Sequence, residues 1–348
     1  MKFGIIGSGS WGTALAKILT DNNNSINWWT RNEANIEYIK KRHHNPQYLS
    51  TAYFDIGKLH LSAKVEEVII QSDAIIIVVP SAYLTDTFSG LSKDIFLNKK
   101  IISAVKGIIP EQNILLNDYL KNEYSVQLSD YFTILGPCHA EEVAAEKLSY
   151  LTFSGIDLKA TKDIAACFRN DYINTIVNSD IYGVQYAAIL KNIYALGAGI
   201  AHGLEYGDNF LSVLIANSGD EMAGFLRKAG IQNLEIGSID HSLHEEVVGE
   251  KHITNYAASV YLGDLLVTCY SLYSRNRTFG NMIGKGYSVK SAQIEMNMVA
   301  EGYNASKCIN TVNKNIHAEM PIAETIYKIL WEKLPPDEGF REIEKMLV

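Results

Sequence analysis

The sequence has little cysteine: four in 348 residues, far apart and in no short motif. They are Cys138, Cys167, Cys269 and Cys308. This scarcity excludes a disulfide framework and is typical of reduced thiols in the cytosol, so we expect a cytoplasmic protein. The pairs His43-His44 and Cys138-His139 lack further ligands at a metal-binding spacing, and we therefore expect no metal.

The chain also lacks an excess of positive charge and a long apolar run. Its 31 Lys and Arg against 39 Asp and Glu give a formal charge of -8. That balance argues against a nucleic-acid partner, although a local anion site needs only a few cations. The apolar run from Ala74 to Pro80 is too short to span a bilayer, and no charged-then-apolar leader precedes the strand-like run from Lys2 to Ile6. We expect a soluble protein without membrane insertion.

The first half of the chain alternates short apolar runs with helical patterns. A length of 348 residues suggests two domains. Strands that are apolar on both faces and alternate with helices predict a parallel sheet covered on both sides. The expected strands are Lys2–Ile6, Ile26–Trp29, Ala74–Val79, Lys100–Val105, Tyr131–Leu135 and Tyr150–Ser154, with a first helix over Trp11–Leu19. We predict an α/β domain over residues 1–180.

The second half has helical periodicity and little strand character. The segment from Gly183 to Ile200 is apolar almost all round, which indicates a helix buried in a core. A last helix is expected from Met320 to Leu334, ended by Pro335-Pro336. We predict an all-helical domain over residues 181–348, with a tight interface to the first because no linker separates them.

A glycine-rich string lies between the first strand and the first helix. Gly7-Ser8-Gly9-Ser10-Trp11-Gly12 fits the pattern G-x-G-x-x-G. Its glycines permit a tight turn, a close approach of backbone amides to a pyrophosphate and close packing of helix on strand. The positive end of the helix then faces the phosphates. Glycines also make ordinary turns, but this placement favours dinucleotide binding.

The end of the second strand bears on the choice between NAD and NADP. It reads Trp29-Thr30-Arg31-Asn32, without the acid that usually binds the adenosine ribose. Arg31 would favour a 2′-phosphate through charge-assisted hydrogen bonds. The alternatives stay open, because Arg31 could be a solvated surface arginine and Glu33 could still reach a ribose.

Lys191 stands within the apolar helix predicted around it. Burying an ammonium is costly unless it is paired or used. A buried lysine suits a general acid, since burial moves its proton affinity towards neutral pH. The plainer interpretation is a lysine whose head reaches solvent from a less buried helix.

Three further strings contain residues that could bind a ligand. Lys106 follows the strand ending at Val105, at the edge where open α/β sheets bind ligands. Gly136-Pro137-Cys138-His139-Ala140 follows another strand and opens a helix. Ser274-Arg275-Asn276-Arg277 offers a hydroxyl, an amide and two guanidiniums for a phosphate or carboxylate. Taken singly, each could be only a loop or turn.

Taken together, these strings resemble the bacterial NAD(P)-dependent glycerol-3-phosphate dehydrogenase family. The resemblance runs in order from about Phe3 to Leu334, and its most specific part runs from Gly263-Asp264-Leu265 through Thr268 to Ser274-Arg275-Asn276-Arg277-Thr278-Phe279-Gly280. The other matching strings are Gly7 to Ala16, Asn45-Pro46-Gln47-Tyr48-Leu49, Val105-Lys106-Gly107, Gly136 to Val143 and Leu190-Lys191-Asn192.

The resemblance implies a Rossmann domain, a helical substrate-binding and dimerisation domain, and a homodimer. It implies conversion between dihydroxyacetone phosphate and sn-glycerol 3-phosphate for phospholipid synthesis, with NADP or NAD. Lys191 would donate the proton, with Lys106, Asp264 and Thr268 around it. The implied cofactor contacts are Gly7, Gly9, Ser10, Trp11, Gly12, Arg31, Lys106, Ala140, Arg275 and Glu301. The implied substrate contacts are Lys106, Gly136, Cys138, Lys191, Asp264, Ser274, Arg275 and Asn276.

The sequence departs from the family pattern at several places. Between Lys191 and Asp264 it has about twenty extra residues, which we expect within 227–259, a long connection to leave unstructured. An arginine usual near Ala216-Asn217-Ser218 is missing, Cys138 replaces a common serine or threonine, and Tyr261 replaces a glycine. A related dehydrogenase of sugar acids or ketoacids, and a dinucleotide-sensing regulator without turnover, are the alternative functions.

Overall fold

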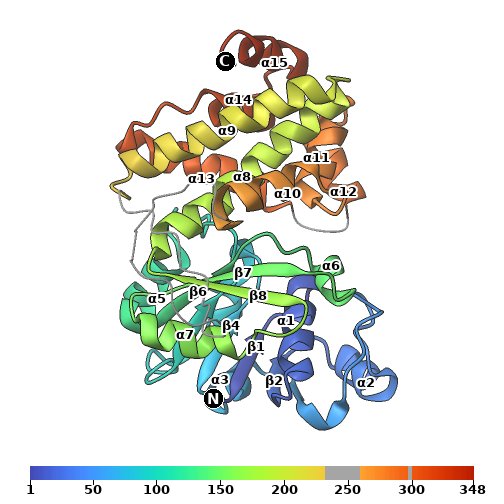
Figure 1. Ribbon diagram of the computed structural model, residues 1–348, viewed down its shortest axis with the longest axis vertical. Helices are drawn as coiled ribbons and strands as arrows, with labels where there is room; N and C mark the ends of the chain where they lie inside the picture. The colour runs from blue at the N-terminus through green and yellow to red at the C-terminus, as the bar shows by residue number, and fades with distance from the viewer. Residues whose placement is uncertain (232–258, 297–299) are drawn as a thin grey trace, which may run out of the picture. The chain divides into compact units, whose positions relative to one another are not determined.

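The computed structural model describes residues 1–231, 259–296 and 300–348. The described chain forms two compact units: Met1–Val105 with Leu115–Ile181, and Lys106–Ile114 with the chain from Tyr182 onward (Figure 1). The segment 106–114 therefore belongs with the helical residues. Of the predicted extra segment 227–259, residues 232–258 lie outside the described residues.

The first unit is built on an eight-stranded sheet with the order β3-β2-β1-β4-β5-β6-β7-β8. Its strands are β1 Phe3–Ile6, β2 Ile26–Trp29, β3 Leu59–Ser62, β4 Ala74–Ile77, β5 Lys100–Ser103, β6 Tyr131–Leu135, β7 Ser149–Ser154 and β8 Ile173–Asn178. The first six strands are parallel, as predicted, and β7 and β8 are parallel to each other.

One pairing differs from the predicted parallel sheet, because β7 runs antiparallel to β6 with Thr133 opposite Ser154. Only the five-residue helix α6, Ala140–Ala144, lies between these two strands. A return in the opposite direction needs no long crossover, so this short connection suits antiparallel pairing. Apolar residues on both faces show that a strand is buried but do not show its direction.

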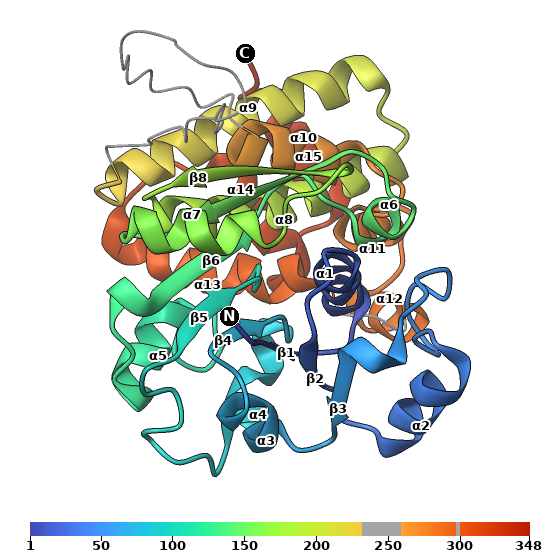
Figure 2. The same cartoon turned by 60° about the horizontal axis from the view of Figure 1, so that its bottom comes forward.

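Helices cover both faces of this sheet. They are α1 Ser10–Asp21, α2 Glu33–Arg42, α3 Val65–Ile70, α4 Leu84–Phe88, α5 Leu116–Tyr124, α6 and α7 Leu158–Ala166, with single 3-10 turns η1 Ile56–Lys58, η2 Ser81–Tyr83 and η3 Leu128–Asp130. Figure 2 shows α1 on one side of β1 and β4, with α3 and α4 on the other. β1 and β4 are buried along their whole length, which explains their continuous apolar sequence.

In the second unit, all regular elements described from α8 onward are helices, while its segment 106–114 has only the isolated β-bridge Ile109–Ile114. It contains α8 Ile181–Gly203, α9 Asp208–Lys228, the π-helical turn η4 Ser259–Gly263, α10 Asp264–Tyr270, α11 Arg275–Gly284, α12 Val289–Glu295, α13 Glu301–Ile316, α14 Pro321–Trp331 and α15 Pro336–Glu344. The buried helix predicted over 183–200 is α8, and the last predicted helix is α14. Pro336 also begins α15, at a position where proline needs no N–H.

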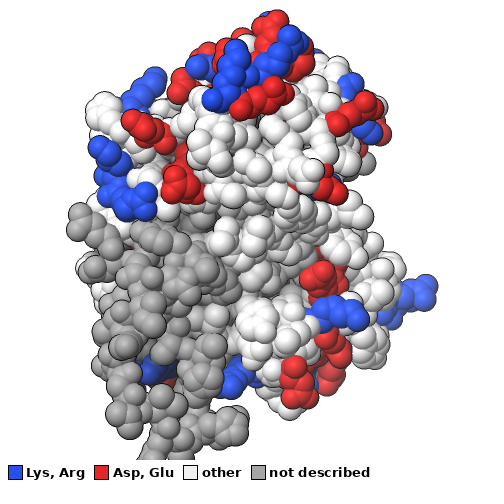
Figure 3. Space-filling model, turned by 45° about the horizontal axis from the view of Figure 1, so that its top comes forward, with Lys and Arg blue, Asp and Glu red and all other residues white. Residues whose placement is uncertain are grey.

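The surface agrees with the charge balance of the sequence. On the face drawn in Figure 3, the end of the helical unit that carries the C-terminus has acidic and basic side chains interspersed. Helix α14 carries the ion pair Lys328–Glu324, and α15 carries the ion pair Arg341–Asp337. No helix of the described residues combines the length and the apolar character that a membrane crossing requires.

A buried carboxylate joins three helices of the second unit. Glu221 of α9 is 7% exposed and accepts hydrogen bonds from the N–H groups of Ile322 (2.8 Å) and Ala323 (2.9 Å) and from the Tyr194 hydroxyl (3.1 Å). It therefore caps the first turn of α14, where an anion is favoured by the helix dipole. Burial raises the pKa of Glu221 to about 7, outweighing the lowering effect of these donors.

This raised pKa predicts a pH-dependent stability. Because the folded pKa of about 7 lies above the ordinary value of 4.5, the folded state binds the proton more tightly. The stabilisation that comes from this tighter proton binding by Glu221 is complete below about pH 4.5 and is lost as the pH rises to about 7. In Glu221→Gln, the free energy of unfolding measured in urea should no longer show this decrease with pH, which is on the order of 3 kcal/mol in the wild type. The exposed Glu332→Gln serves as the control, and the same pH dependence in Glu221→Gln as in the wild type would contradict the assignment.

Candidate active site

The glycine-rich turn of the first unit has the backbone that the sequence predicts. Gly7 has φ +128°, which a side chain disfavours, and a Cβ on Gly12 would lie 2.3 Å from the Gly7 carbonyl oxygen. A Cβ on Gly9 would meet nothing within 4 Å. Gly9 is also the N-cap of α1 and has no side chain to accept from the first N–H groups. The open space and the free helix end fit a dinucleotide pyrophosphate.

Two side chains outside the string hold this turn in place. The Trp28 indole N–H donates to the Gly7 carbonyl at 3.0 Å. The Asn45 amide donates to the Ser8 carbonyl (3.0 Å) and to the Thr13 hydroxyl (2.9 Å). Sequence reasoning missed both as site residues. The signal was present for Asn45, which begins a string shared with the family.

Arg31 lies just beyond the end of β2 and is exposed. Thr30 before it is buried and accepts a hydrogen bond from the Ser8 hydroxyl at 3.1 Å, while Asn32 after it caps α2 through the Ala34 N–H. The turn that carries Arg31 is therefore tied to the glycine-rich turn. No ion pair is formed by the Arg31 guanidinium within the described chain.

The string after β6 is a tight buried turn. Gly136 has φ +130°, and a Cβ there would lie 2.7 Å from the Tyr150 carbonyl oxygen. Cys138 is 6% exposed, and its thiol donates to the Gly136 carbonyl at 3.1 Å. The cysteine thus holds its own turn together, and Ala140 follows as the first residue of α6.

Lys191 and Asp264 form a buried ion pair in the second unit. The ammonium of Lys191 on α8 contacts Asp264 Oδ2, at the start of α10, and the two side chains are 4% and 2% exposed. Thr268, one turn later, donates its hydroxyl to the Asp264 carbonyl at 2.6 Å. An unpaired ammonium in such a place would carry a large desolvation penalty, which the carboxylate offsets. The pair keeps an ammonium group inside an apolar helix.

A nearby thiol takes no part in this chemistry. Cys269 lies on α10, close enough to Lys191, Arg277 and Asp264 for their charges to act on it. Burial dominates over these charges and raises the pKa of Cys269 to about 12. It stays a neutral thiol near pH 7, which excludes a thiolate nucleophile at this position.

Two asparagines connect the segments that carry the candidate substrate residues. The Asn192 amide donates to the Lys106 carbonyl (3.1 Å), and its oxygen accepts from Asn276 Nδ2 (2.9 Å). Asn276 Oδ1 in turn accepts from the Gly302 N–H, next to Glu301, at 3.0 Å. Sequence reasoning did not assign Asn192. This ladder brings Lys106, Lys191, the arginine turn and Glu301 into one arrangement.

The arginine turn begins α11. The Ser274 hydroxyl caps the helix by accepting from the Arg277 N–H at 3.3 Å, and Ser274 itself is 3% exposed. Arg275, the first residue of the helix, is exposed, and Arg277 is partly buried. A guanidinium on a capped helix start, where backbone N–H groups also point outward, is suited to a phosphate.

The candidate residues thus divide into two sets. The first unit holds Gly7, Gly9, Ser10, Trp11, Gly12, Arg31, Gly136, Cys138 and Ala140, and the second holds Lys106, Lys191, Asp264, Thr268, Ser274, Arg275, Asn276 and Glu301. Among the described residues no cluster of three or more His, Cys, Asp or Glu could hold a metal ion.

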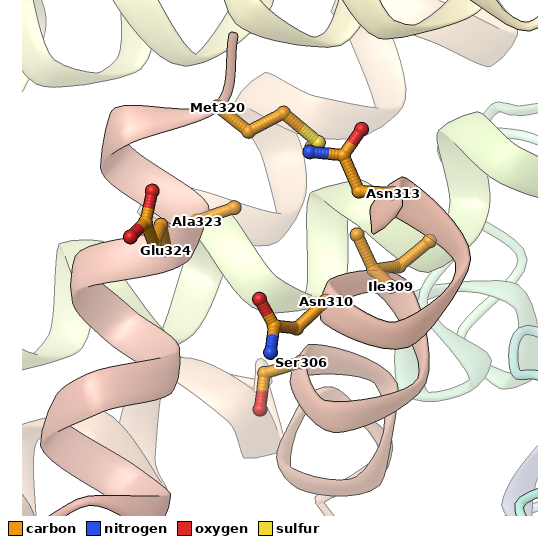
Figure 4. Close-up of a pocket in the computed structure, with 7 residues that line it drawn as sticks. All are labelled: Ser306, Ile309, Asn310, Asn313, Met320, Ala323 and Glu324. Atoms are coloured by element: carbon orange, nitrogen blue, oxygen red, sulfur yellow. The ribbon is translucent and has the colours of Figure 1, made fainter. Parts of the chain in front are cut away.

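Two hollows on the protein are lined by residues that belong to neither set of candidate site residues. The one between α13 and α14 (Figure 4) has about 30 Å³, and its lining includes Ser306, Asn313 and Met320. That volume suits a single water. A larger hollow of about 370 Å³ includes Lys99, just before β5, and Asp130, just before β6, at the opposite edge from the carboxyl ends of the strands.

A Rossmann sheet with an open phosphate turn, joined in one chain to a helical unit with a buried lysine, defines a dinucleotide-dependent dehydrogenase. Residues 2–161 match the N-terminal family model of NAD-dependent glycerol-3-phosphate dehydrogenase, and residues 180–341 match its C-terminal model. The chain belongs to this family.

Similarity to relatives and to a solved structure extends over almost the whole chain. The chain is 33% identical to glycerol-3-phosphate dehydrogenase [NAD(P)+] of Streptococcus agalactiae, over 95% of this chain and 92% of the relative. It is 32% identical to that of Oceanobacillus iheyensis, over 98% and 93%. The crystal structure of glycerol-3-phosphate dehydrogenase from Coxiella burnetii has a TM-score of 0.85 at 26% identity and covers 98% of both chains.

The buried ion pair predicts that Lys191 is needed for turnover. Lys191→Ala should bind the cofactor but lose about two to four orders of magnitude in kcat, the range for a general acid. Steady-state kinetics test the loss, and quenching of the reduced cofactor's fluorescence tests binding. Lys285→Ala, an exposed lysine of the same unit, is the control. Near-normal kcat in Lys191→Ala would remove the lysine from the mechanism.

Proposed function

We propose that this chain reduces dihydroxyacetone phosphate to sn-glycerol 3-phosphate with NADPH or NADH, and catalyses the reverse reaction. The observation that carries the proposal is the ladder through Asn192 and Asn276, which connects the helix of Lys191 with the start of the arginine turn. A proton donor and a phosphate-binding guanidinium on adjacent segments fit a small molecule that has a ketone and a phosphate.

The protein's own residues have three tasks in this reaction. The phosphate binds at Arg275 and the capped start of α11, and this remote binding energy positions the ketone. The nicotinamide, when bound, supplies or accepts the hydride. Lys191 Nζ donates a proton to the ketone oxygen as its negative charge develops, and Asp264 holds the ammonium in place. In the reverse direction Lys191 takes the proton from the alcohol.

The remaining residue assignments are those that the resemblance to the family implies. Gly7, Gly9, Ser10, Trp11 and Gly12 would hold the pyrophosphate. The other cofactor contacts that we propose are Arg31, Lys106, Ala140, Arg275 and Glu301. Further substrate contacts would come from Lys106, Gly136, Cys138, Ser274 and Asn276. We infer a cytoplasmic homodimer whose product serves phospholipid synthesis.

A direct assay tests the function. Adding dihydroxyacetone phosphate to the protein with NADH, and separately with NADPH, should bleach the reduced-nicotinamide absorbance and form one sn-glycerol 3-phosphate per cofactor. Turnover of ketoacids or sugar acids in place of this substrate would support a sister dehydrogenase. Cofactor binding without any turnover would support a sensing role.

Arg275→Ala should weaken catalysis selectively for the phosphorylated substrate. A charge-assisted contact is worth about 1.5–3 kcal/mol, so kcat/KM with dihydroxyacetone phosphate should fall by roughly one to two decades. Unphosphorylated dihydroxyacetone, a poor substrate, should lose little further, and Arg275→Lys should restore only part of the activity.

The comparison is made with saturating cofactor, because Arg275 is also a proposed cofactor contact. Arg341→Ala, an exposed arginine on α15, is the control. An equal loss with both substrates would mean that Arg275 acts through the cofactor or the fold, and the phosphate assignment would be wrong.

Arg31→Ala should raise the KM for NADPH more than the KM for NADH, since only NADPH has the 2′-phosphate that the guanidinium would bind. Initial rates with each cofactor give both constants. The exposed Arg42→Ala on α2 controls for loss of positive charge from the same unit. Equal changes in both KM values would show that Arg31 does not select the cofactor.

A further inference from the structure

Helices α8 and α11 are packed at backbone contact along three turns (Figure 1). A Cβ on Gly280 would lie 2.1 Å from the Leu196 carbonyl oxygen, and one on Gly284 would lie 2.4 Å from the Ile200 carbonyl oxygen. From the other side, a Cβ on Gly199 would lie 2.1 Å from the Arg277 carbonyl oxygen. No side chain larger than hydrogen fits between these two backbones.

The contacts keep one register along both helices. Asn192 bonds Asn276, Leu196 meets Gly280, and Ile200 meets Gly284, so each contact advances four residues along both chains. The helices therefore run parallel, side by side, and Lys191 and Arg275 precede the first contact by one residue each. The packing fixes the backbone of the proton donor relative to the backbone of the phosphate ligand.

Glycine in a helix interior lowers helix stability relative to alanine and so needs a compensating role, which applies to the first glycine on each helix among the four at this contact, since the second ends its helix. They are Gly199 and Gly203 on α8 and Gly280 and Gly284 on α11. A fixed spacing between the two helices is one such compensating role, because catalysis requires reacting groups to be placed within a fraction of an ångström.

We propose that these four glycines are positioning residues that set the spacing between Lys191 and Arg275, and so match the site to a ketone and a phosphate on one small molecule. The proposal rests on the proposed function. A methyl group at this contact moves α11 from α8, so a substrate anchored by its phosphate presents its ketone to Lys191 at the wrong place. An unanchored substrate is not affected in this way.

The test compares three alanine variants with a matched control on α8. The substitutions are Gly280→Ala, Gly284→Ala and Gly203→Ala, whose methyl groups would approach backbone oxygens to 2.1, 2.4 and 2.5 Å. The control is Gly197→Ala, whose methyl would meet only the end of the Ile326 side chain, at 2.7 Å. That flexible side chain can move without changing the spacing of α8 and α11.

We expect kcat/KM with dihydroxyacetone phosphate to fall by about tenfold to a hundredfold, in the order Gly280→Ala, Gly284→Ala, Gly203→Ala. With dihydroxyacetone the loss should stay within about threefold, both measured with saturating cofactor because Arg275 is also a proposed cofactor contact, and Gly197→Ala should resemble the wild type. If Gly280→Ala does not fold, the milder Gly284→Ala and Gly203→Ala, at the ends of their helices, carry the test.

Two results would overturn the proposal. One is a folded Gly284→Ala that keeps dihydroxyacetone phosphate turnover within about twofold of the wild type. The other is an equal loss with both substrates, which would assign the glycines to folding alone. Wild-type protein that does not reduce dihydroxyacetone phosphate would instead refute the proposed function, so the two failures are distinguishable.

Discussion

The candidate site depends on the buried ion pair between Lys191 and Asp264. Each side chain is almost fully buried, and the opposite charge of each offsets part of the cost of burying the other. Such a pair is weak support for stability, since apolar residues of similar volume stabilise a core at least as well. The proposed proton transfer gives a reason for its presence, because the buried ammonium would hold a proton where solvent does not compete.

The rest of the helical unit gives this pair its geometry. The asparagine ladder connects α8 to the segment of Lys106 and to the start of α11, and Gly302 follows Glu301 at the end of the ladder. The Ser274 cap orients the first turn of α11. Glu221 of α9 likewise connects helices through hydrogen bonds: it joins Tyr194, further along α8, to the start of α14. Buried polar groups thus do the positioning, and each has partners.

Much of this arrangement could be predicted from the sequence. The glycine turn and the apolar helix around Lys191 have strong local patterns, and both lie where the sequence predicts them. Strands β3 and β8 were missed because they are only partly buried and contain polar residues, which hides the apolar signal. The direction of β7 was wrong because a strand's direction depends on its neighbours and not on its own residues.

The positioning residues were harder to predict for a related reason. An asparagine in a helix, such as Asn192, gives no local sign of whether its amide meets water or another buried amide, and Asn276 was predicted only as a substrate contact. Glycines 199, 203, 280 and 284 look like weak points of two helices until the helices are placed together. Only the three-dimensional contact shows that nothing larger fits.

The most direct test of the central claim measures stability and activity together in Lys191→Met, Asp264→Leu and the double variant. Each single change removes the opposite charge from one buried charge and should lower the free energy of unfolding by about 3–5 kcal/mol. The double variant should recover most of that stability and still have no measurable turnover. A double variant that is as unstable as the two single losses combined, or one that retains turnover, would contradict the claim that the pair is kept for proton transfer.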